Sequence, residues 1–380
     1  MAKVKFGNVV KEYKGKIDQK NNPYEFYVAG DHMDTDDLTI RRRGRFATDD
    51  VGPAFIREFK KGQVLYGSRR TYLRKIAVAD FDVVTANTTF VLETKDESIL
   101  RQRLLPFIMY TESFTEWSIK KSKGSTNPYV LFKDLADYEF ELPDIGKQDE
   151  LVELLWSMID TRDAYNNLIV SIDELVKSQF IERFEGQGYA VVKAKTFMTN
   201  MRNGVSPSKK GLHAEKVLTL SAVTQGAFDP EAWKDGIFDE CPPADKRIHT
   251  SEFYMCRGNG NKMLVGTAVF SPEDHDDLVF PDTVIAAHID SNIILLPYLF
   301  VAWKMPSVRK QIEENARTTN GTYKINQTVL SNIELIVPPL EKQNEFVSFV
   351  EQSDKSKFEL RKALAELTAM YKRIIQENLV

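Results

Sequence analysis

The sequence predicts an α+β protein built from two tandem α/β domains, each followed by one long helix. Three observations favour this fold. A Pro-x-x-x-Lys-Gln pattern occurs at Pro143 and again at Pro338, 195 residues later (338 minus 143), in a chain of 380 residues. Each copy opens a long segment without Gly or Pro, from Lys147 to about Glu185 and from Glu341 onward. Apolar residues recur in both segments at steps of three and four, the spacing of one helix face.

The two helices are long enough to pack on each other. At 1.5 Å per residue each spans on the order of 55 Å, more than a small domain needs to cover its core. We therefore predict an antiparallel pair forming a coiled-coil strut, which relates the two halves by a pseudo-twofold axis. Two ordinary amphipathic helices on separate cores are the alternative. The residues expected to pack are Leu151, Leu155, Met158, Ile172, Leu360, Leu364, Leu367, Tyr371 and Ile374.

The apolar stripe of the first helix has two further features. It is widened by Leu154, Leu168 and Leu175. It is interrupted only by Arg162.

The predicted helix ends divide the chain into four parts. The first domain covers residues 1–145, and the first long helix covers 146–185. The second domain covers 186–338, and the second long helix covers 339–380.

Composition indicates an ordinary soluble globular protein, with 42% hydrophobic and 28% charged residues. The net charge of −4 argues against a protein that coats nucleic acid through charge alone, although it permits local basic faces. No apolar run approaches a membrane span, and the N-terminus lacks the apolar core of a signal peptide, so we expect a cytoplasmic protein. Cys241 and Cys256 lack metal-pair spacing and are expected to be reduced thiols.

The most informative stretch of the first half is a basic loop between two apolar strands, at residues 60–78. Arginines and a tyrosine on a rigid hairpin can contact phosphates or guanine edges and pack against a sugar. A basic hairpin tip exposed only for solubility is the competing interpretation. The loop carries Arg69, Arg70, Tyr72, Arg74 and Lys75.

Two other basic segments lie in the first half. The run Arg41–Arg45 is either a solvated face or a phosphate grip, with Arg43 as its candidate contact. A helix is predicted from Leu100 to Trp117, and a basic, hydroxyl-rich loop follows at residues 120–127.

An acidic turn at residues 30–37 places His32 among four aspartates. A metal site is one interpretation of this turn. A solvated loop is the interpretation that we favour, because nothing else in the first half supplies a matching His or Cys.

The second half repeats the plan of the first with different loop residues. Residues 217–223 resemble the early strand of the first half, and residues 298–314 repeat its helix. Residues 254–262 stand where the basic loop stood, and residues 317–324 repeat the hydroxyl-rich loop. One scaffold with divergent loops suits two different short target sequences better than one repeated ligand.

No catalytic site is predicted. Asn22-Pro23-Tyr24 and Asn127-Pro128-Tyr129 are similar to the Asn-Pro-Pro-aromatic signature of amino-methyltransferases, but both lack the second proline. Gly258–Lys262 is too short for a dinucleotide fingerprint. Five scattered histidines offer no paired base and nucleophile. The sequence therefore predicts a protein that acts by binding and holds no metal or cofactor of its own.

Nearly the whole chain resembles the DNA specificity subunits of type I restriction-modification systems. The resemblance rests on the two helix starts, the Gly30-Asp-His-Met sequence, residues 67–75 and residues 320–326. It implies two target-recognition domains that each read half of an interrupted site in double-stranded DNA, with long helices holding them apart. It also implies two DNA methyltransferase (modification) subunits that carry S-adenosylmethionine, and restriction subunits that use ATP. This chain would itself be a non-catalytic reader.

The resemblance also assigns contact residues by position. The first half-site would be contacted by the basic loop together with Lys121, Lys123, Ser125 and Thr126. The second half-site would be contacted by Arg257, Asn259, Asn261, Lys262, Thr319, Asn320, Thr322 and Lys324. Asparagine can pair with adenine through two hydrogen bonds, whereas lysine suits phosphate.

Two other functions remain open from the sequence. A helical scaffold would join partner proteins without binding DNA, and assembly without DNA selectivity would support it. A recognition subunit of a different defence system, or of a stand-alone DNA methyltransferase, would be identified by its neighbouring genes.

Overall fold

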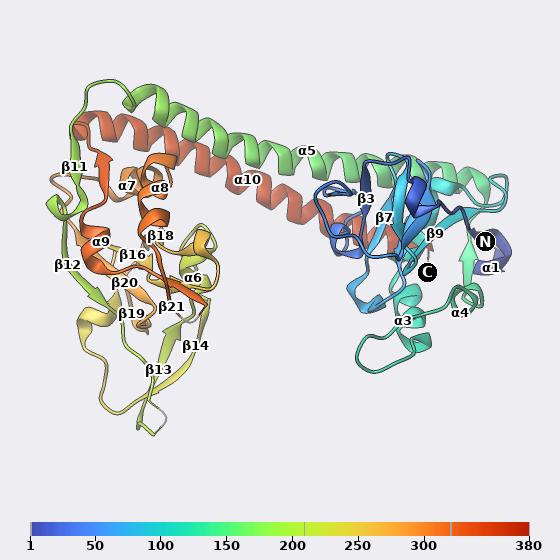
Figure 1. Ribbon diagram of the computed structural model, residues 1–380, viewed down its shortest axis with the longest axis horizontal. Helices are drawn as coiled ribbons and strands as arrows, with labels where there is room; N and C mark the ends of the chain where they lie inside the picture. Colours follow the sequence, from blue (N-terminus) through green and yellow to red (C-terminus); the bar gives the residue numbers. More distant parts are fainter. Residues whose placement is uncertain (1, 209, 320, 380) are drawn as a thin grey trace. The chain divides into compact units, whose positions relative to one another are not determined.

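The computed structural model describes residues 2–208, 210–319 and 321–379. The chain divides into two compact units, Met1–Asn166 with Arg361–Val380, and Asn167–Leu360. Each unit combines β-sheets and short helices with parts of two long helices (Figure 1). Each long helix therefore contributes one part to each unit.

The first unit is built on two four-stranded sheets. The antiparallel sheet has the order β2-β9-β6-β7, and the mixed sheet has the order β4-β3-β8-β5, in which β3 and β8 are parallel. A further pair joins β1 to β10. The strands are β1 (Ala2–Lys5), β2 (Val10–Glu12), β3 (Phe26–Val28), β4 (Gly44–Arg45), β5 (Phe55–Phe59), β6 (Val64–Gly67), β7 (Ile76–Val78), β8 (Val83–Ala86), β9 (Thr89–Thr94) and β10 (Glu139–Leu142). The short helices are α1 (Phe6–Val9), α2 (Leu105–Met109), α3 (Glu112–Lys121) and α4 (Phe132–Ala136).

The second unit has the same kinds of sheet and one additional small sheet. Its four-stranded sheets have the orders β12-β20-β16-β18 and β14-β13-β19-β15, β11 pairs with β23, and β17-β22-β21 form the additional sheet. The strands are β11 (Val191–Lys193), β12 (Met198–Asn203), β13 (His213–Leu218), β14 (Trp233–Phe238), β15 (Arg247–Ile248), β16 (Glu252–Cys256), β17 (Gly258–Asn259), β18 (Ala268–Val269), β19 (His275–Val279), β20 (Val284–Ile289), β21 (Arg317–Thr319), β22 (Thr322–Lys324) and β23 (Glu334–Ile336). The short helices are α6 (Ser221–Thr224), α7 (Leu296–Ala302), α8 (Pro306–Asn315) and α9 (Gln327–Ser331).

The internal repeat extends through both units, as the duplicated helix start predicts. The strand orders match position by position, so that β13 stands where β3 stands and β16 where β6 stands. The parallel pair also recurs, as β3 with β8 in the first unit and β13 with β19 in the second. The amino-acid sequences of the two repeats have diverged, whereas their strand topology is the same.

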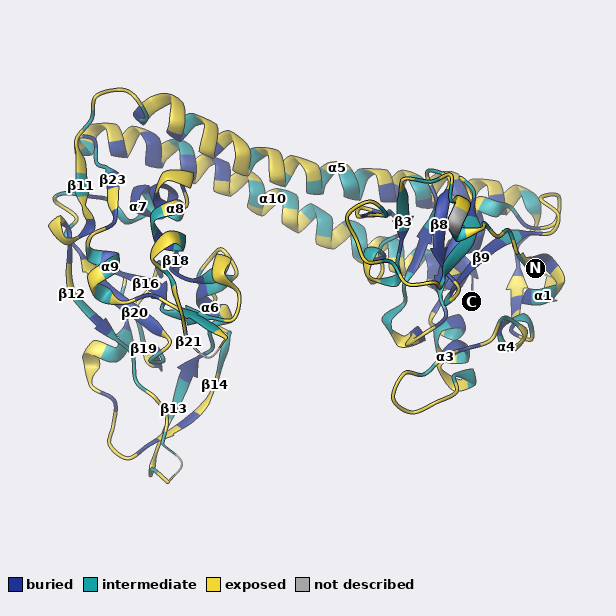
Figure 2. Ribbon diagram, viewed as in Figure 1, coloured by how far each residue is buried: buried dark blue, intermediate teal, exposed yellow. Residues whose placement is uncertain are grey.

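Buried central strands hold each unit together by dividing their side chains between two clusters. Successive side chains of a strand point to opposite faces. In β6, Val64 and Tyr66 pack into the cluster beneath the helices, and Leu65 packs between the two sheets. In β16, Met255 packs into the cluster beneath the helices, and Tyr254 packs between the two sheets. The buried interior of both units is visible in Figure 2.

The long helices are α5 (Ile145–Phe184) and α10 (Leu340–Leu379), and they pack together within each unit. In the first unit, Leu151, Leu155 and Met158 of α5 share a buried cluster with Ile375 of α10, against which Leu367, Tyr371 and Ile374 pack. In the second unit, Phe180 and Phe184 lie 5.7 and 5.3 Å from Phe346, measured between ring centroids. The other three packing candidates are half-buried: Ile172, Leu360 and Leu364.

The prediction that the α5 stripe is widened was wrong. Leu154, Leu168 and Leu175 are exposed by 46%, 49% and 48%. Each lies one residue before a more buried member of the stripe, about 100° around the helix, where no described segment covers it. The buried face of α5 is therefore narrow.

A buried glutamine fixes the start of each long helix. The side-chain amide of Gln148 donates to the carbonyls of Ile99 and Pro143, both at 2.9 Å, and its oxygen accepts from the N–H of Arg101 at 3.0 Å. Gln343 makes the same three kinds of hydrogen bond, at 2.8 to 2.9 Å, in the second unit. We call each arrangement a glutamine latch. It explains why Gln recurs at a fixed distance from Pro in both copies.

The helix predicted from Leu100 to Trp117 is broken in the structure. It forms α2 and α3, and Thr111 caps the second of these by accepting a hydrogen bond from the N–H of Phe114. In the second unit, Pro306 begins α8 after α7 has ended. The apolar periodicity continues through both breaks, and for that reason it did not reveal them.

Within the described residues no helix is long and apolar enough to cross a membrane. Both cysteines are free thiols: Cys241 is exposed, and burial raises the pKa of Cys256 to about 11.

Candidate nucleic-acid interface

Two basic segments that the sequence places far apart lie side by side in the first unit. The first basic loop, residues 68–75, follows β6, and the hydroxyl loop, residues 122–130, follows α3. The N–H of Arg70 donates to the carbonyl of Pro128 at 2.7 Å, and a second backbone hydrogen bond of 2.9 Å joins the loops nearby. The two loops therefore form a single surface.

Arginine and tyrosine side chains are exposed on this surface. Arg69 and Arg70 are exposed, and no carboxylate of the described residues lies within ion-pair distance of either guanidinium. Tyr72 is 53% exposed, and Tyr129, which pairs with Arg69 in an antiparallel bridge, is 39% exposed. Free guanidinium groups beside aromatic rings suit phosphates, sugars and guanine edges.

The two candidate lysines at the end of α3 and in the hydroxyl loop have partners within the unit. Lys123 forms an ion pair with Asp134 at 2.9 Å, and this hydrogen bond lowers the pKa of Asp134 from its ordinary value. The ammonium of Lys121 lies 4.7 Å from the centre of the Trp117 ring. The remaining candidates of this loop are exposed hydroxyl groups, Ser125 and Thr126.

Arg74 and Lys75 point their polar groups into the unit. The guanidinium of Arg74 binds Asp36 at 2.6 Å and two further groups of the domain. The ammonium of Lys75 donates to the carbonyl of Gly30 at 2.6 Å. Both side chains are half-buried, so they differ from Arg69 and Arg70 in accessibility as well as in pairing.

The turn between these residues has an unusual backbone. Arg70 and Arg74 flank the short 3₁₀ helix Thr71–Leu73 and have positive φ angles, 50° and 48°. A left-handed conformation costs about 1–2 kcal/mol for a residue other than glycine. Such backbone strain occurs mostly at functional sites, where the surrounding structure holds it.

The Arg41–Arg45 run forms a solvated face, the first of the two expected alternatives, since all four of its arginines are exposed. Arg43 lies over the rings of Phe81 and Phe26, at 4.2 and 5.5 Å from their centres. The other three guanidiniums of the run, those of Arg41, Arg42 and Arg45, are paired with carboxylates. Of this run, Arg43 alone lacks a carboxylate partner among the described residues.

We had expected the acidic turn at residues 30–37 to be a solvated loop, but aspartates of this turn are bound by arginines of the same unit. Asp36 and Asp37 bind Arg74 and Arg162, which belong to the basic loop and to α5. His32 accepts a hydrogen bond from the N–H of Ala29, and burial lowers the pKa of the imidazole. No cluster of three or more metal-ligating side chains occurs in the described part of the chain.

In the second unit, the two candidate loops also come together, as a small sheet. Gly258 pairs with Lys324, and Asn259 pairs with Tyr323. A Cβ atom on Gly258 would lie 3.1 Å from Cγ of Lys324, so the lysine stem crosses the space that a side chain would occupy. Lys324 and Lys262 are exposed, whereas Arg257 donates to the carbonyl of Asp282 at 3.1 Å.

The asparagines of the second unit use their oxygens to shape the loop. Asn259 accepts a hydrogen bond from the N–H of Asn261, and Asn261 accepts one from the N–H of Met263. Thr322 is half-buried in β22. The backbone of Thr319 pairs with that of Thr322. The side chain of Thr319 and the predicted contact Asn320 lie outside the part of the chain that the structure describes.

One exposed residue of the first surface was missed from the sequence. Tyr129 stands beside Arg69, but the Asn-Pro-Tyr segment was considered only as a methyltransferase signature. Its proximity to the basic loop depends on a pairing between segments about 60 residues apart, which no local pattern reveals.

A sequence model of the family described as "Type I restriction modification DNA specificity domain" matches residues 3–174 and 283–368, more than half of the chain. The chain belongs to this family. The two matched regions include most of both long helices and every residue of both glutamine latches.

Curated members of the family are distant relatives of this chain. The EcoKI specificity subunit of Escherichia coli K12 is 24% identical over 73% of this chain and 66% of its own length. The StySPI specificity subunit of Salmonella potsdam is 26% identical over 70% of this chain and 63% of its own length. The matches thus span slightly less than two thirds of these relatives.

Solved structures of the family share the fold at low sequence identity. The type I restriction-modification S subunit of M. genitalium is 14% identical, with a TM-score of 0.56 over 100% of this chain and 96% of that chain. A chain from a structural study of assembly and conformational transition in a type I system is 17% identical, with a TM-score of 0.54 over 99% and 96%.

Proposed function

We propose that this chain is the DNA-specificity subunit of a type I restriction-modification complex and reads a bipartite, interrupted site. The observation that carries the proposal is the pair of exposed loop surfaces, one in each repeat, with divergent residues on a shared topology. In the first unit the surface presents arginine and tyrosine, and in the second it presents lysine and asparagine. Two such surfaces suit two different half-sites.

The exposure of each side chain indicates which residues would contact DNA. Arg69, Arg70 and Tyr72 would contact the first half-site, with the exposed groups of the hydroxyl loop beside them. Lys262 and Lys324 would contact phosphates of the second. The asparagine amide groups retain N–H donors for base edges, since their oxygens are used within the loop.

The helices α5 and α10 would act as an antiparallel coiled-coil strut that separates two recognition domains, residues 1–145 and 186–338. Their packing within each unit and their equal lengths of 40 residues support this role. The pair would also bind two modification subunits and, through them, restriction subunits. S-adenosylmethionine and ATP would be bound by these partners, and this cytoplasmic chain would perform no catalysis.

Methylation mapping tests this function directly. A host carrying this chain and its neighbouring modification gene is compared, by long-read sequencing, with a strain lacking the chain. We expect an interrupted methylated motif only when the chain is present. Assembly with the modification subunit but without any chain-dependent motif would instead support the scaffold function. A motif without a restriction gene nearby would support a stand-alone methyltransferase.

The exposed ring of Tyr129 yields a first specific prediction. Tyr129→Ala is expected to weaken binding of the assembled complex to the first half-site by about 1 kcal/mol, the size of one aromatic packing contact. Tyr129→Phe, the matched control, keeps the ring and removes only the hydroxyl. Equilibrium binding to duplexes with one intact half-site measures both. Equal affinity of the alanine variant and the unsubstituted complex would exclude the ring from the interface.

A further inference from the structure

We propose that Arg74, Asp36 and Asp37 with Arg162 form a positioning relay, through which α5 sets the conformation of the first basic loop. None of the four residues needs to touch DNA. The proposal rests on the proposed function, because the loop is the one that would contact the first half-site.

The relay begins at the strained end of the loop. Arg74 has a φ of 48° and is bound in three directions. Its guanidinium donates to the carboxylate of Asp36 at 2.6 Å, to the hydroxyl of Thr115 at 2.9 Å and to the carbonyl of Tyr110 at 2.9 Å. These bonds tie the left-handed turn to the acidic turn and to the start of α3. Without them the turn would lose the contacts that oppose its backbone strain.

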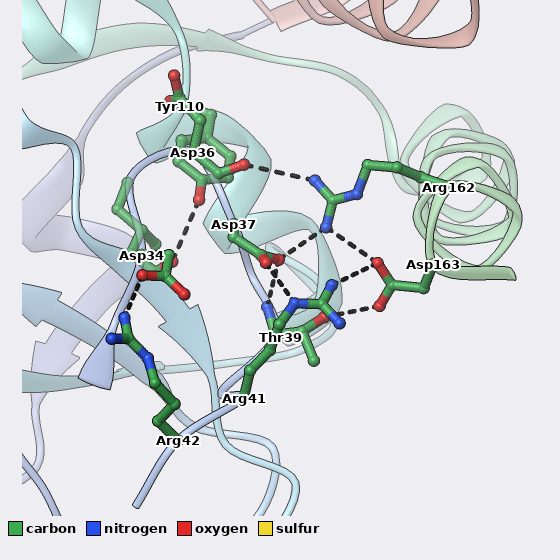
Figure 3. A network of polar contacts seen from close by, with 10 residues as sticks. Asp34, Asp36, Asp37, Thr39, Arg41, Arg42, Tyr110, Arg162 and Asp163 are labelled. Carbon is green, nitrogen blue, oxygen red and sulfur yellow. Dashed lines mark hydrogen bonds and ion pairs between the residues drawn. The ribbon is translucent and has the colours of Figure 1, made fainter. Parts of the chain in front are cut away.

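The relay continues from the acidic turn to α5. Arg162 donates to the carboxylate of Asp37 at 2.7 Å and to the backbone carbonyl of Asp36 at 3.4 Å. Figure 3 shows this guanidinium between the acidic turn on one side and Asp163 of the same helix on the other. Arg41 closes the network by bonding both Asp37 and Asp163. The acidic turn is thus held on α5 from two directions.

Burial makes the bond between Arg162 and Asp37 more than an ordinary surface pair, whereas the side chain of Asp36 is 47% exposed. The side chains of Arg162 and Asp37 are only 20% and 17% exposed. Burial by itself opposes ionisation of Asp37, but hydrogen bonds from Arg41 and from the N–H of Thr39 outweigh it and lower the pKa of this carboxyl. Partly buried, mutually hydrogen-bonded charges fix one geometry more strongly than solvated ones do. The interrupted apolar stripe of α5 is explained by this role of Arg162.

The second unit provides an internal comparison. Lys357, which lies 195 residues after Arg162 (357 minus 162), pairs with Asp173 and Asp354 of the long helices and not with a loop of the domain. Where the first loop ends in Arg74, the second ends near Val265, which is fully buried in an apolar cluster. Arg309 of α8 also donates to the backbone carbonyls of Met263 and Val265, at 3.0 and 3.1 Å. The second loop is therefore held within its own domain by apolar packing and by Arg309, and we expect it to be insensitive to the helix position that the relay uses.

Removing opposite charges should have the same consequence if the relay operates. Arg162→Ala removes a positive charge, and Asp36→Asn removes a negative one. Simple electrostatics predicts that the second change strengthens DNA binding. The relay predicts that each change weakens binding of the assembled complex to a duplex carrying only the first half-site, by about tenfold, the size of one lost arginine contact. Binding to a duplex carrying only the second half-site should not change.

Salt dependence separates positioning from contact. A lost phosphate contact lowers the slope of log affinity against log salt by about 0.9, so Arg69→Ala with Arg70→Ala should lower it if both touch phosphates. Arg162→Ala should leave the slope unchanged, because the bound loop still makes its phosphate contacts and the lost affinity is the free energy of ordering that loop. The double variant Arg162→Ala with Arg74→Ala should lose little more affinity than either single variant, because both changes break one relay. Arg162→Lys, which keeps a donor for Asp37, should restore part of the affinity.

Lys357→Ala is the matched control and should affect neither half-site. Equal loss at both half-sites, a lower salt slope for Arg162→Ala, stronger first-site binding by Asp36→Asn, or unchanged first-site binding would each overturn the relay. If Arg162→Ala prevents folding, the affinities of Asp36→Asn and Arg162→Lys for the two half-sites test the relay. Absence of site-specific binding by the unsubstituted complex would instead contradict the proposed function.

Discussion

Arg69→Ala combined with Arg70→Ala is expected to reduce the affinity of the assembled complex for the first half-site by about 30- to 1,000-fold, or roughly 2–4 kcal/mol. Both guanidiniums are exposed and have no carboxylate partner in the described structure, so the full charge of each is available to DNA. Each contact contributes about 1–3 kcal/mol if it is made to a base edge and less if it is made to a phosphate. Complex assembly should be unaffected, because the helices lie elsewhere in the chain.

Arg45→Ala is the control for this double variant. Arg45 belongs to the same unit and has the same charge, but it is paired with Glu25 at 2.8 Å. Its removal should change affinity little beyond the general electrostatic effect. Binding is measured at several salt concentrations, since only the specific contacts alter discrimination between the correct and a scrambled half-site. Unchanged affinity of the double variant at moderate salt would remove the basic loop from the interface.

The loops could be predicted from sequence because their chemistry is local. A Gly-Ser turn between two apolar strands, followed by several cations, indicates an exposed basic hairpin in any fold. Which of those cations are free is decided by residues far away. Arg74 and Arg69 are equivalent by composition, but only Arg74 meets a carboxylate, Asp36, 38 residues earlier in the chain.

The long helices could be predicted for a similar reason, while their buried face could not. Absence of Gly and Pro and a regular apolar spacing are properties of the segment itself. Burial depends on what covers each position. Leu154 and Leu155 have the same side chain, yet one is 46% exposed and the other fully buried, because α10 and the first domain cover only one side of α5. Arg162 is the converse case, since its partner is a loop that the sequence alone describes as solvated.

The repeated glutamine can be seen in the sequence, but only the structure explains why it recurs. Its recurrence after Pro143 and Pro338 is visible in the sequence, but the three hydrogen bonds that account for it are not. Gln148 and Gln343 are 1% and 0% exposed, and each satisfies one N–H and two carbonyl groups that bracket the helix start. A buried backbone group left without a partner costs about 1–3 kcal/mol. The latches are therefore expected to be among the largest polar contributions to stability in either unit.

Gln148→Ala should consequently destabilise the first unit by several kcal/mol, and Gln343→Ala should destabilise the second by a similar amount. Gln148→Met keeps most of the volume and removes every hydrogen bond, so it should lose nearly as much as alanine if the bonds matter and far less if packing matters. Gln352→Ala, at an exposed site of α10, should be neutral. Hydrogen exchange, read separately at the starts of α5 and α10 alongside urea unfolding, assigns each loss to its own unit. Retained protection of the Arg101 N–H in Gln148→Ala would show that the latch does not stabilise the helix start, because this N–H would then have found another partner.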